Sequence, residues 1–380
     1  MKKNFLSGIL ALSLGVMLLL KSGDLGEGIR KGLYICSFSV IPSLFPFMVL
    51  SVFICKSSCS EFFSALLKPL TKILKIPPIA AGAFFSSLIG GYPTAAKCIN
   101  DLVHAGFMDR KTGARMLCFC VNAGPPFLIS TIGLSIFGNI KTGVLIFAAQ
   151  LLSSFLIGLL LSVFSKKQDF KNYPKISEYK SSASIAVESV VSAAKSCFIM
   201  CSFIILFYGV LELLQGGIVF SALSDNPMAK TLLCGFLEVT TGVFSAGEIP
   251  GYTAVIISGA IVSFSGVSVI LQITATVDES KIPVFPFILS RFFHSAFTAG
   301  FLAIFFAFSK ETASAFSIRG TAAEAVLSVS APAAVSLLCL ASLFLLSIVP
   351  EKSQKEPLFS RIKYKLALFR HGQIKKSVIK

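Results

Sequence analysis

Charged residues are scarce in this chain of 380 residues, because Asp, Glu, Lys and Arg together make up 14%. Ordinary soluble domains carry roughly 25% charged residues and about 45–50% apolar residues. Here the hydrophobic fraction reaches 54%. This composition excludes a water-soluble enzyme and indicates a protein of the lipid bilayer.

Metal-binding and catalytic patterns are also scarce. The three His residues lie far apart, and the ten Cys residues form no Cys-x-x-Cys pair. No Ser-His-Asp, His-Glu-x-x-His or paired-aspartate pattern occurs, and no ATP-binding loop. We therefore expect no enzyme and no resident cofactor. Without an ATP-binding loop, any energy that the protein uses would come from a gradient, with Na⁺ or H⁺ as coupling ions, from a partner or from a substrate itself.

Long apolar runs are present instead, and each is long enough to cross a bilayer, which takes about 20 residues. The first run lacks an Ala-x-Ala cleavage site, so we expect a retained helix rather than a signal peptide. The eight expected spans lie near residues 4–20, 32–55, 113–138, 142–165, 191–215, 252–276, 283–309 and 326–350.

Two further apolar stretches are interrupted by polar residues and glycine. Residues 77–98 carry Gly-Gly-Tyr-Pro at 90–93, and residues 229–248 carry Glu238. Each stretch can hold two half-helices joined by a turn. Irregular backbone at membrane depth survives only where protein or a water-filled cavity satisfies its polar groups. Both stretches are therefore predicted to be re-entrant hairpins.

The distribution of positive charge agrees with this count of spans. Eight crossings and two hairpins place both termini on one side, and most Lys and Arg residues then fall on that side. Because cytoplasmic loops of membrane proteins are rich in Lys and Arg, we expect both termini in the cytoplasm. The net charge of +16 is thus interpreted as membrane topology, with no nucleic acid as a partner.

The order of elements repeats along the chain. Residues 32–165 and 191–309 both run helix, hairpin, helix, helix. Each half crosses three times, so the second half is inverted, which is typical of secondary transporters with a midplane site. The remaining segments are a first helix and loop at 1–31, a cytoplasmic linker at 166–190, a last loop and helix at 310–350, and a basic amphipathic tail at 351–380.

The third element of each half contains an expected break. Pro125 and Pro126 remove backbone donors in the first half, and Gly266 lies among three serines at 263–268 in the second. We expect each hairpin tip to face one of these breaks. Simple kinks that tilt a helix are the alternative for any single break.

Half-helix N-termini that meet at the membrane centre would favour an anionic group. Carbonyls freed at 122–126 are a weaker candidate site for a cation such as Na⁺.

Three polar side chains within apolar segments need a reason. A carboxylate such as Glu238 costs roughly 2.5–3.5 kcal/mol near the membrane centre, so it is predicted to contact substrate or carry a coupling proton. A structural hydrogen bond that closes the hairpin tip is its alternative role. Arg291 is expected either to reach the cytoplasmic surface or to supply a fixed positive charge near the cavity. Gln272 would bond a ligand or a neighbouring helix.

Four motifs lie at the expected hairpin tips and breaks, and they are SLIGGYPTAA at 87–96, LCFCVNAGPPF at 117–127, GFLEVTTG at 235–242 and SFSGVSVILQ at 263–272. Together they resemble the YlbJ (SpoVV) type of sporulation integral membrane proteins. That family carries paired nucleoside-recognition (Gate) domains and is similar to concentrative nucleoside transporters. The chain departs from it with Gly-Gly-Tyr-Pro for Gly-x-Pro-x-Gly and with Phe-Ser-Gly for Phe-Gly-Gly.

The resemblance implies a transporter that moves dipicolinate, a small aromatic dianion, from the mother cell across the outer forespore membrane. We thus expect an all-α polytopic protein with eight spans, two hairpins and two inverted repeats with broken helices. Nucleoside or nucleobase transport and a non-transporting membrane scaffold are the alternatives. The predicted substrate-binding residues are Gly90, Gly91, Tyr92, Thr94, Asn122, Ala123, Gly124, Glu238, Thr240, Thr241, Ser263, Phe264, Ser265, Gly266, Ser268, Gln272 and Arg291.

Overall fold

A computed structural model describes residues 12–13, 15–16, 18–57, 59–165, 182–215, 217–223 and 225–308. The expected last helix and tail, most of the expected first helix and residues 166–181 of the linker lie outside this part. Before residue 166 the described part of the chain forms two π-helices, labelled η, and eight α-helices. They are α2 (Ser22–Ile35), η1 (Cys36–Val40), α3 (Ile41–Lys56), α4 (Cys59–Leu66), α5 (Lys68–Ile73), α6 (Ala80–Gly90), α7 (Tyr92–His104), α8 (Arg110–Cys120), η2 (Pro126–Ile136) and α9 (Ile140–Val163). After residue 181 it forms α10 (Ser182–Gln215), α11 (Ile218–Ala222), α12 (Pro227–Leu237), α13 (Val239–Ala246), α14 (Tyr252–Phe264), α15 (Gly266–Val277) and α16 (Phe285–Phe308).

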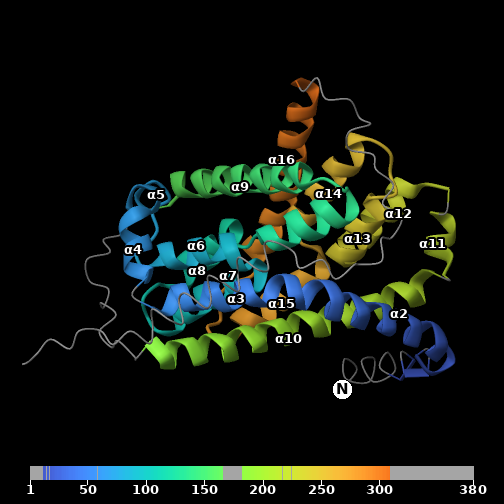
Figure 1. Ribbon diagram of the computed structural model, residues 1–380, viewed down its shortest axis with the longest axis horizontal. Coiled ribbons are helices and arrows are strands. Elements are labelled where there is room, and N and C mark those ends of the chain that lie inside the picture. Colours follow the sequence, from blue (N-terminus) through green and yellow to red (C-terminus); the bar gives the residue numbers. More distant parts are fainter. Residues whose placement is uncertain are drawn as a thin grey trace, which may run out of the picture. The chain divides into compact units, whose positions relative to one another are not determined.

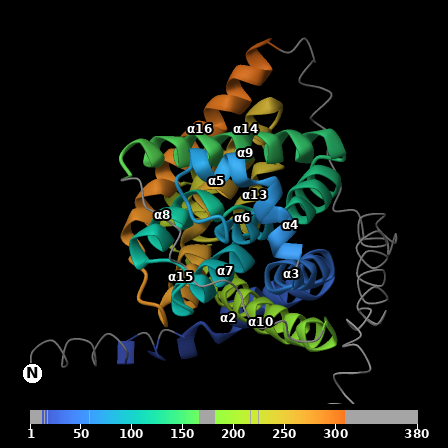
Figure 2. The same cartoon turned by 90° about the vertical axis from the view of Figure 1, so that its left-hand side faces the viewer.

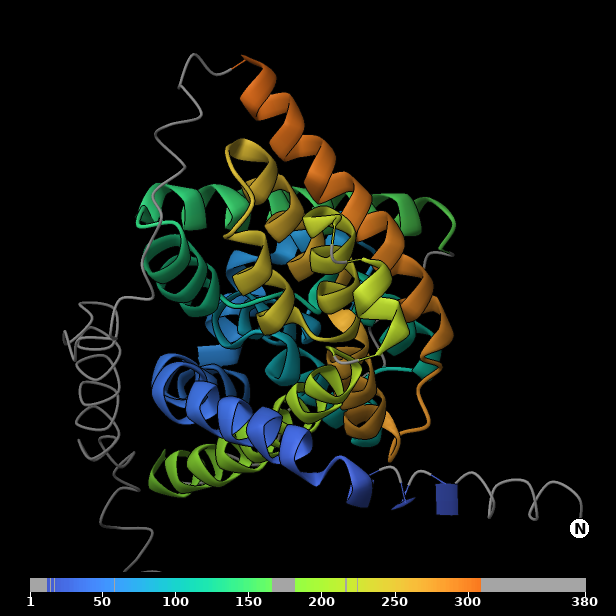
Figure 3. The same cartoon turned by 90° about the vertical axis from the view of Figure 1, so that its right-hand side faces the viewer.

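A long helical pair forms one wall of the fold. Elements α2, η1 and α3 continue from one to the next and pack along α10 (Figures 1 and 3). Gly28 and Gly32 permit the close approach, because a Cβ on Gly28 would lie 2.6 Å from the Tyr208 carbonyl oxygen. Small residues at such crossings let two membrane helices pack backbone to backbone.

Two ion pairs mark the ends of this helical pair and show that its members run antiparallel. Lys31 Nζ lies 3.1 Å from a carboxylate oxygen of Glu212, and Lys56 Nζ lies 2.6 Å from Glu188. A helix rises about 1.5 Å per residue, so the two lysines are separated by about 37 Å. A bilayer is roughly 40–45 Å thick with its headgroups, and we place the two pairs near its opposite faces.

Five helices of the described part are long and apolar enough to cross a membrane. They are Ser22–Lys56, Ile140–Val163, Ala183–Gln215, Tyr252–Val277 and Phe285–Phe308. The expected span at 113–138 is not among them because α8 and η2 divide it into two short helices. The predicted total of eight spans stays a prediction, since residues 326–350 and most of 4–20 lie outside the described residues.

Large apolar side chains cover the outside of these helices. Phe198, Phe285 and Phe308 are each at least 74% exposed. Soluble proteins rarely leave contiguous apolar surface of this kind to water. Together with the long apolar helices, this surface identifies an integral membrane protein.

Two expected loop regions are helical instead. Residues 22–31, expected to be loop, form most of α2, where Arg30 bonds Glu27 at 2.7 Å and Lys21 lies 3.5 Å from Asp24. Such pairs, three or four residues apart, stabilise a helix that its own hydrophobicity does not indicate. The end of the expected linker also belongs to a helix, because α10 begins at Ser182.

The helices are interrupted at the four places where interruptions are expected. The chain breaks between α6 and α7 at Gly91, between α8 and η2 at 121–125, between α12 and α13 at Glu238, and between α14 and α15 at Ser265. Helices α9 and α16 pack against each other and against the broken helices (Figure 2). Re-entry of the hairpins from one side and inversion of the repeats stay predictions.

Candidate functional site

The first hairpin tip, residues 90–93, packs on the first break, residues 121–125. Gly91 has a φ of +78° and a ψ of −165°, a backbone region that is essentially reserved for glycine. A Cβ on Gly91 would lie 3.1 Å from the Gly124 nitrogen and 3.7 Å from the Asn122 carbonyl oxygen. The tip and the break therefore meet backbone to backbone.

The second hairpin tip, residues 237–240, meets the second break, residues 264–266, in the same way. A Cβ on Gly266, whose φ is +63°, would lie 3.2 Å from the Gly235 carbonyl oxygen and 3.4 Å from that of Leu237. The Tyr92 hydroxyl of the first tip donates to the Val262 carbonyl, just before the second break. Both tips and both breaks therefore belong to one cluster.

A cavity of about 50 Å³, called here the central cavity, lies in this cluster. Its walls come from both tips, the first break, α3, α10 and α15. Leu44 and Met200 on its wall lie midway along the stretches between the two ion pairs, so the cavity lies near the middle of the long helical pair. The lining residues are Val40, Leu44, Gly90, Gly91, Tyr92, Pro93, Ala123, Gly124, Phe127, Met200, Ile204, Glu238, Val239, Thr240, Val269 and Gln272.

Glu238 has the structural role expected of it and also lines the central cavity. It is 2% exposed and caps α13, because one carboxylate oxygen accepts from Thr240 Oγ1 at 2.7 Å and the other from the Thr241 amide at 2.8 Å. These bonds satisfy donors at the helix N-terminus. The same residue lines the central cavity, so a solute there would meet a carboxyl group that also holds the tip closed.

A buried polar network supports the first break from behind. Gln150 on α9 bonds both backbone groups of Ala123, accepting from its N–H at 3.3 Å and donating to its C=O at 3.1 Å. Ser154, one turn further along, donates to Asn122 Oδ1 at 2.6 Å and lies 3.2 Å from His294 Nε2. An unwound backbone in a membrane requires partners of this kind, and the network supplies them.

Arg291 belongs to this network and not to the cavity wall. Its Nη1 donates to the Val121 carbonyl at 2.8 Å and its Nη2 donates to the Cys118 carbonyl. The end of a helix leaves such carbonyls without partners and partly negative, so the guanidinium neutralises the end of α8. The side chain is 0% exposed, and the expectation that Arg291 reaches the surface is therefore wrong.

Some carbonyls at the first break bond to the protein itself. The carbonyl of Val121 accepts from Arg291, that of Ala123 accepts from Gln150, and that of Gly124 accepts from the Leu128 amide at 3.2 Å. The first break is thus stabilised from within the protein, and a cation held by carbonyls at 122–126 stays a prediction.

Eight of the predicted site residues line the central cavity, and these are Gly90, Gly91, Tyr92, Ala123, Gly124, Glu238, Thr240 and Gln272. The other nine are not among the residues that line it. Thr94 donates to the Gly91 carbonyl at 2.9 Å, the Thr241 hydroxyl donates to the Glu238 carboxylate, and the ring of Phe264 stacks on that of Phe236. The remaining residues are Asn122 and Arg291 in the buried network, and Ser263, Ser265, Gly266 and Ser268 at or beside the second break.

Two polar groups on α15 have no hydrogen-bond partner within the described part of the chain. They are Ser268 Oγ and Gln272 Nε2, and both residues are buried. An unpaired buried donor costs roughly 1–3 kcal/mol. Gln272 lines the central cavity, so its amide is available to a ligand there.

Sequence patterns alone do not identify the apolar residues of the cavity wall or the polar side chains that bond the first break. Val40, Met200 and Val269 look like any other core residues in a span. Gln150 and His294 are visible as lone polar residues in apolar helices, and that pattern is the hint from which they could have been found.

Fold and cavity together define a class: integral membrane proteins whose interrupted helices surround a small, buried, partly polar site. A sequence comparison finds similarity to the sporulation integral membrane protein YlbJ of Bacillus subtilis (strain 168). The two chains are 24% identical over 310 residues, which cover 73% of this chain and 76% of that protein. No family model and no solved structure matches this chain.

Proposed function

We propose that this protein is a secondary transporter that moves a small solute through the central cavity. The observation that supports this most is the meeting of two hairpin tips and two helix breaks, from both halves of the chain, around one buried cavity. Interrupted helices that surround a midplane site are typical of such transporters. A scaffold would gain nothing from backbone breaks that require a buried polar network to stabilise them.

The cavity has the size of a closed state. At about 50 Å³ it is far below the roughly 300–1,000 Å³ of ordinary small-molecule sites. Transport would therefore require a tip to withdraw from its break. At the first tip and the first break, the backbone contact that would separate is the one between Gly91 and Gly124.

Sporulation gives the first candidate for the solute. The name of the similar YlbJ protein places it in sporulation, and the family resemblance implies dipicolinate. The cavity wall offers Glu238 and, within the described part, no Lys or Arg. A dianion would thus require a proton on Glu238, whose O–H can then donate to a substrate carboxylate.

Nucleoside transport is the second candidate, and the same charge distribution favours it. A neutral nucleoside has donors and acceptors that match the Glu238 carboxylate, the Thr240 hydroxyl and the Gln272 amide without an added proton. Both candidate solutes would pass through the central cavity. Dipicolinate requires a proton on Glu238, whereas a nucleoside does not.

Uptake into proteoliposomes that contain the purified protein tests the proposal. Labelled dipicolinate and labelled uridine would be offered separately, with and without an inward proton gradient. Saturable dipicolinate entry that the gradient accelerates supports the first candidate, and uridine entry without such dependence supports the second. Entry of neither solute above empty liposomes would favour the scaffold.

A further inference from the structure

A second cavity, called here the α3–α7 cavity, lies outside the site just described. It measures about 640 Å³, within the range of small-molecule sites. Its walls come from the end of α3, from α6 and α7, and from the start of α10. Its chemically distinctive lining residues are Cys55, Lys56, Lys97, Cys98, Asp101, His104 and Glu188.

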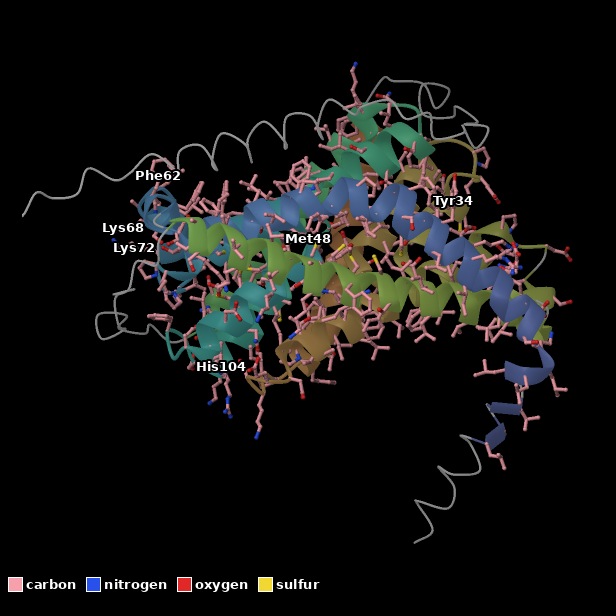
Figure 4. All side chains as sticks on the ribbon, turned by 60° about the horizontal axis from the view of Figure 1, so that its bottom comes forward. Tyr34, Met48, Phe62, Lys68, Lys72 and His104 are labelled. Atoms are coloured by element: carbon pink, nitrogen blue, oxygen red, sulfur yellow. The ribbon has the colours of Figure 1, made fainter. Side chains whose placement is uncertain are left out.

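The cavity lies near one face of the membrane. Lys56 and Glu188, which form the ion pair at one end of the long helical pair, both line it. In Figure 4, His104 of this cavity and Tyr34, one turn from Lys31, lie on opposite sides of Met48. The positive-charge pattern predicts that the Lys56 end faces the cytoplasm.

Small polar side chains connect this cavity with the central one. Cys98 Sγ lies 3.0 Å from Cys55 Sγ and 3.4 Å from Ser86 Oγ, and Ser86 in turn bonds Ser51. Ser51 Oγ would lie 2.8 Å from a Cβ on Gly90, and Gly90 lines the central cavity. The barrier between the cavities is thus made of short side chains and the first tip.

Two amines line the cavity in weak ion pairs. Lys56 pairs with Glu188 and Lys97 with Asp101, both at 2.6 Å, and all four side chains are 28–37% exposed. Exposed pairs are worth about 0–1 kcal/mol. An incoming oxygen acceptor can therefore share these amines at little cost, whereas the central cavity has no such amine within the described part.

We infer that the α3–α7 cavity is the aqueous vestibule in which the solute first binds, held by Lys56 and Lys97 through carboxylate or carbonyl oxygens. The inference rests on the proposed transport function. From here the solute would pass Cys55 and Cys98 and enter the central cavity when the first tip withdraws.

Thiol labelling in the full-length protein tests the vestibule. Single-cysteine variants retain Cys55 or Cys120, with alanine at the other cysteines, since Cys120 is 0% exposed and does not line the cavity. The negatively charged reagent 2-sulfonatoethyl methanethiosulfonate should modify Cys55 at least tenfold faster than Cys120. If the single-cysteine chains fail to fold, wild type and its Cys55→Ala variant replace them, and the variant should lose one labelled thiol by intact mass.

Uptake after labelling tests the route. Full modification of Cys55 should stop solute entry, and dithiothreitol should restore it, while treatment of the Cys120 variant changes nothing. Equal labelling rates of Cys55 and Cys120 would contradict the inference that the α3–α7 cavity is an aqueous vestibule. Uptake that persists with Cys55 fully modified would overturn the route and leave the transport function intact. Absence of uptake in the unlabelled wild type would instead remove the transport function and the route with it.

Substitution of the amine tests the binding role. Lys97→Met should raise the half-saturating solute concentration several-fold with an unchanged maximal rate. Lys72 is an exposed lysine at the same end of the protein (Figure 4) and does not line the cavity. Lys72→Met should therefore leave both parameters unchanged. Equal behaviour of the two variants would contradict the role of Lys97.

Discussion

The contact between the first tip and the first break makes Gly91→Ala a sharp test of the fold around the cavity. Gly91 has a φ of +78° and a ψ of −165°, and non-glycine residues in such regions cost of order 1–3 kcal/mol. The new methyl group would also lie 3.1 Å from the Gly124 nitrogen. The Gly124 nitrogen is a backbone atom, so it cannot move away from the methyl group as the end of a flexible side chain could.

This cost applies to the closed arrangement, in which the tip is seated. A penalty of 1–3 kcal/mol shifts an equilibrium by about 5- to 150-fold. The Gly91→Ala protein should therefore populate tip-open and partly unfolded forms more often. It should lose its monodisperse peak at a lower temperature in a size-exclusion assay of the detergent-purified protein.

Gly300→Ala is the matched control. Gly300 lies within α16, and a Cβ there would have nothing within 4 Å. Alanine in a helix interior is about 0.5–1 kcal/mol more favourable than glycine, so this variant should be as stable as wild type or more so. Equal thermal stability of Gly91→Ala and Gly300→Ala would refute the tip–break contact.

Two further predictions concern the network behind the first break. Gln150→Leu should destabilise the protein by about 1–3 kcal/mol for each of the two Ala123 backbone groups that lose a partner, measured as a fall in thermal stability, and it should reduce uptake. Arg291→Met should reduce thermal stability by a similar amount, because two carbonyls at the end of α8 lose their donor. Arg291→Lys should restore only part of that stability, since an ammonium lacks the planar fork of a guanidinium.

Controls for these variants come from the protein surface. Gln215→Leu changes an exposed glutamine at the end of α10, and Arg30→Met changes an arginine whose side chain is 71% exposed. Both should remain within about 0.5 kcal/mol of wild type. Destabilisation by these controls as large as that by the buried variants would show that the assay does not report on the break.

The interruptions of the helices could be predicted because each has a local cause. Gly91, the Asn-Ala-Gly-Pro-Pro run at 122–126, Glu238 and Gly266 are polar or conformationally special residues inside apolar runs, and each disfavours a continuous helix whatever surrounds it. For the same reason, eight of the predicted site residues lie on the cavity wall.

Properties that depend on long-range packing could not be predicted. Nothing near Arg291 in sequence indicates that it bonds carbonyls more than 160 residues away. The helix at 22–31 was missed because charge pairs, not hydrophobicity, stabilise it. The closed size of the cavity depends on how the tips seat on the breaks, which local patterns do not record.

Uptake by two glutamate variants compares the central cavity with the end of α10 most directly. Glu238→Ala removes the whole carboxyl group from the cavity wall, whereas Glu212→Ala removes a carboxyl group near the end of α10 whose partner is Lys31 of α2. Labelled dipicolinate and uridine would be offered to both variants and to wild type in proteoliposomes. Transport through the central cavity predicts that Glu238→Ala loses at least tenfold in uptake of the transported solute while Glu212→Ala keeps the wild-type rate. Wild-type uptake by Glu238→Ala would contradict it.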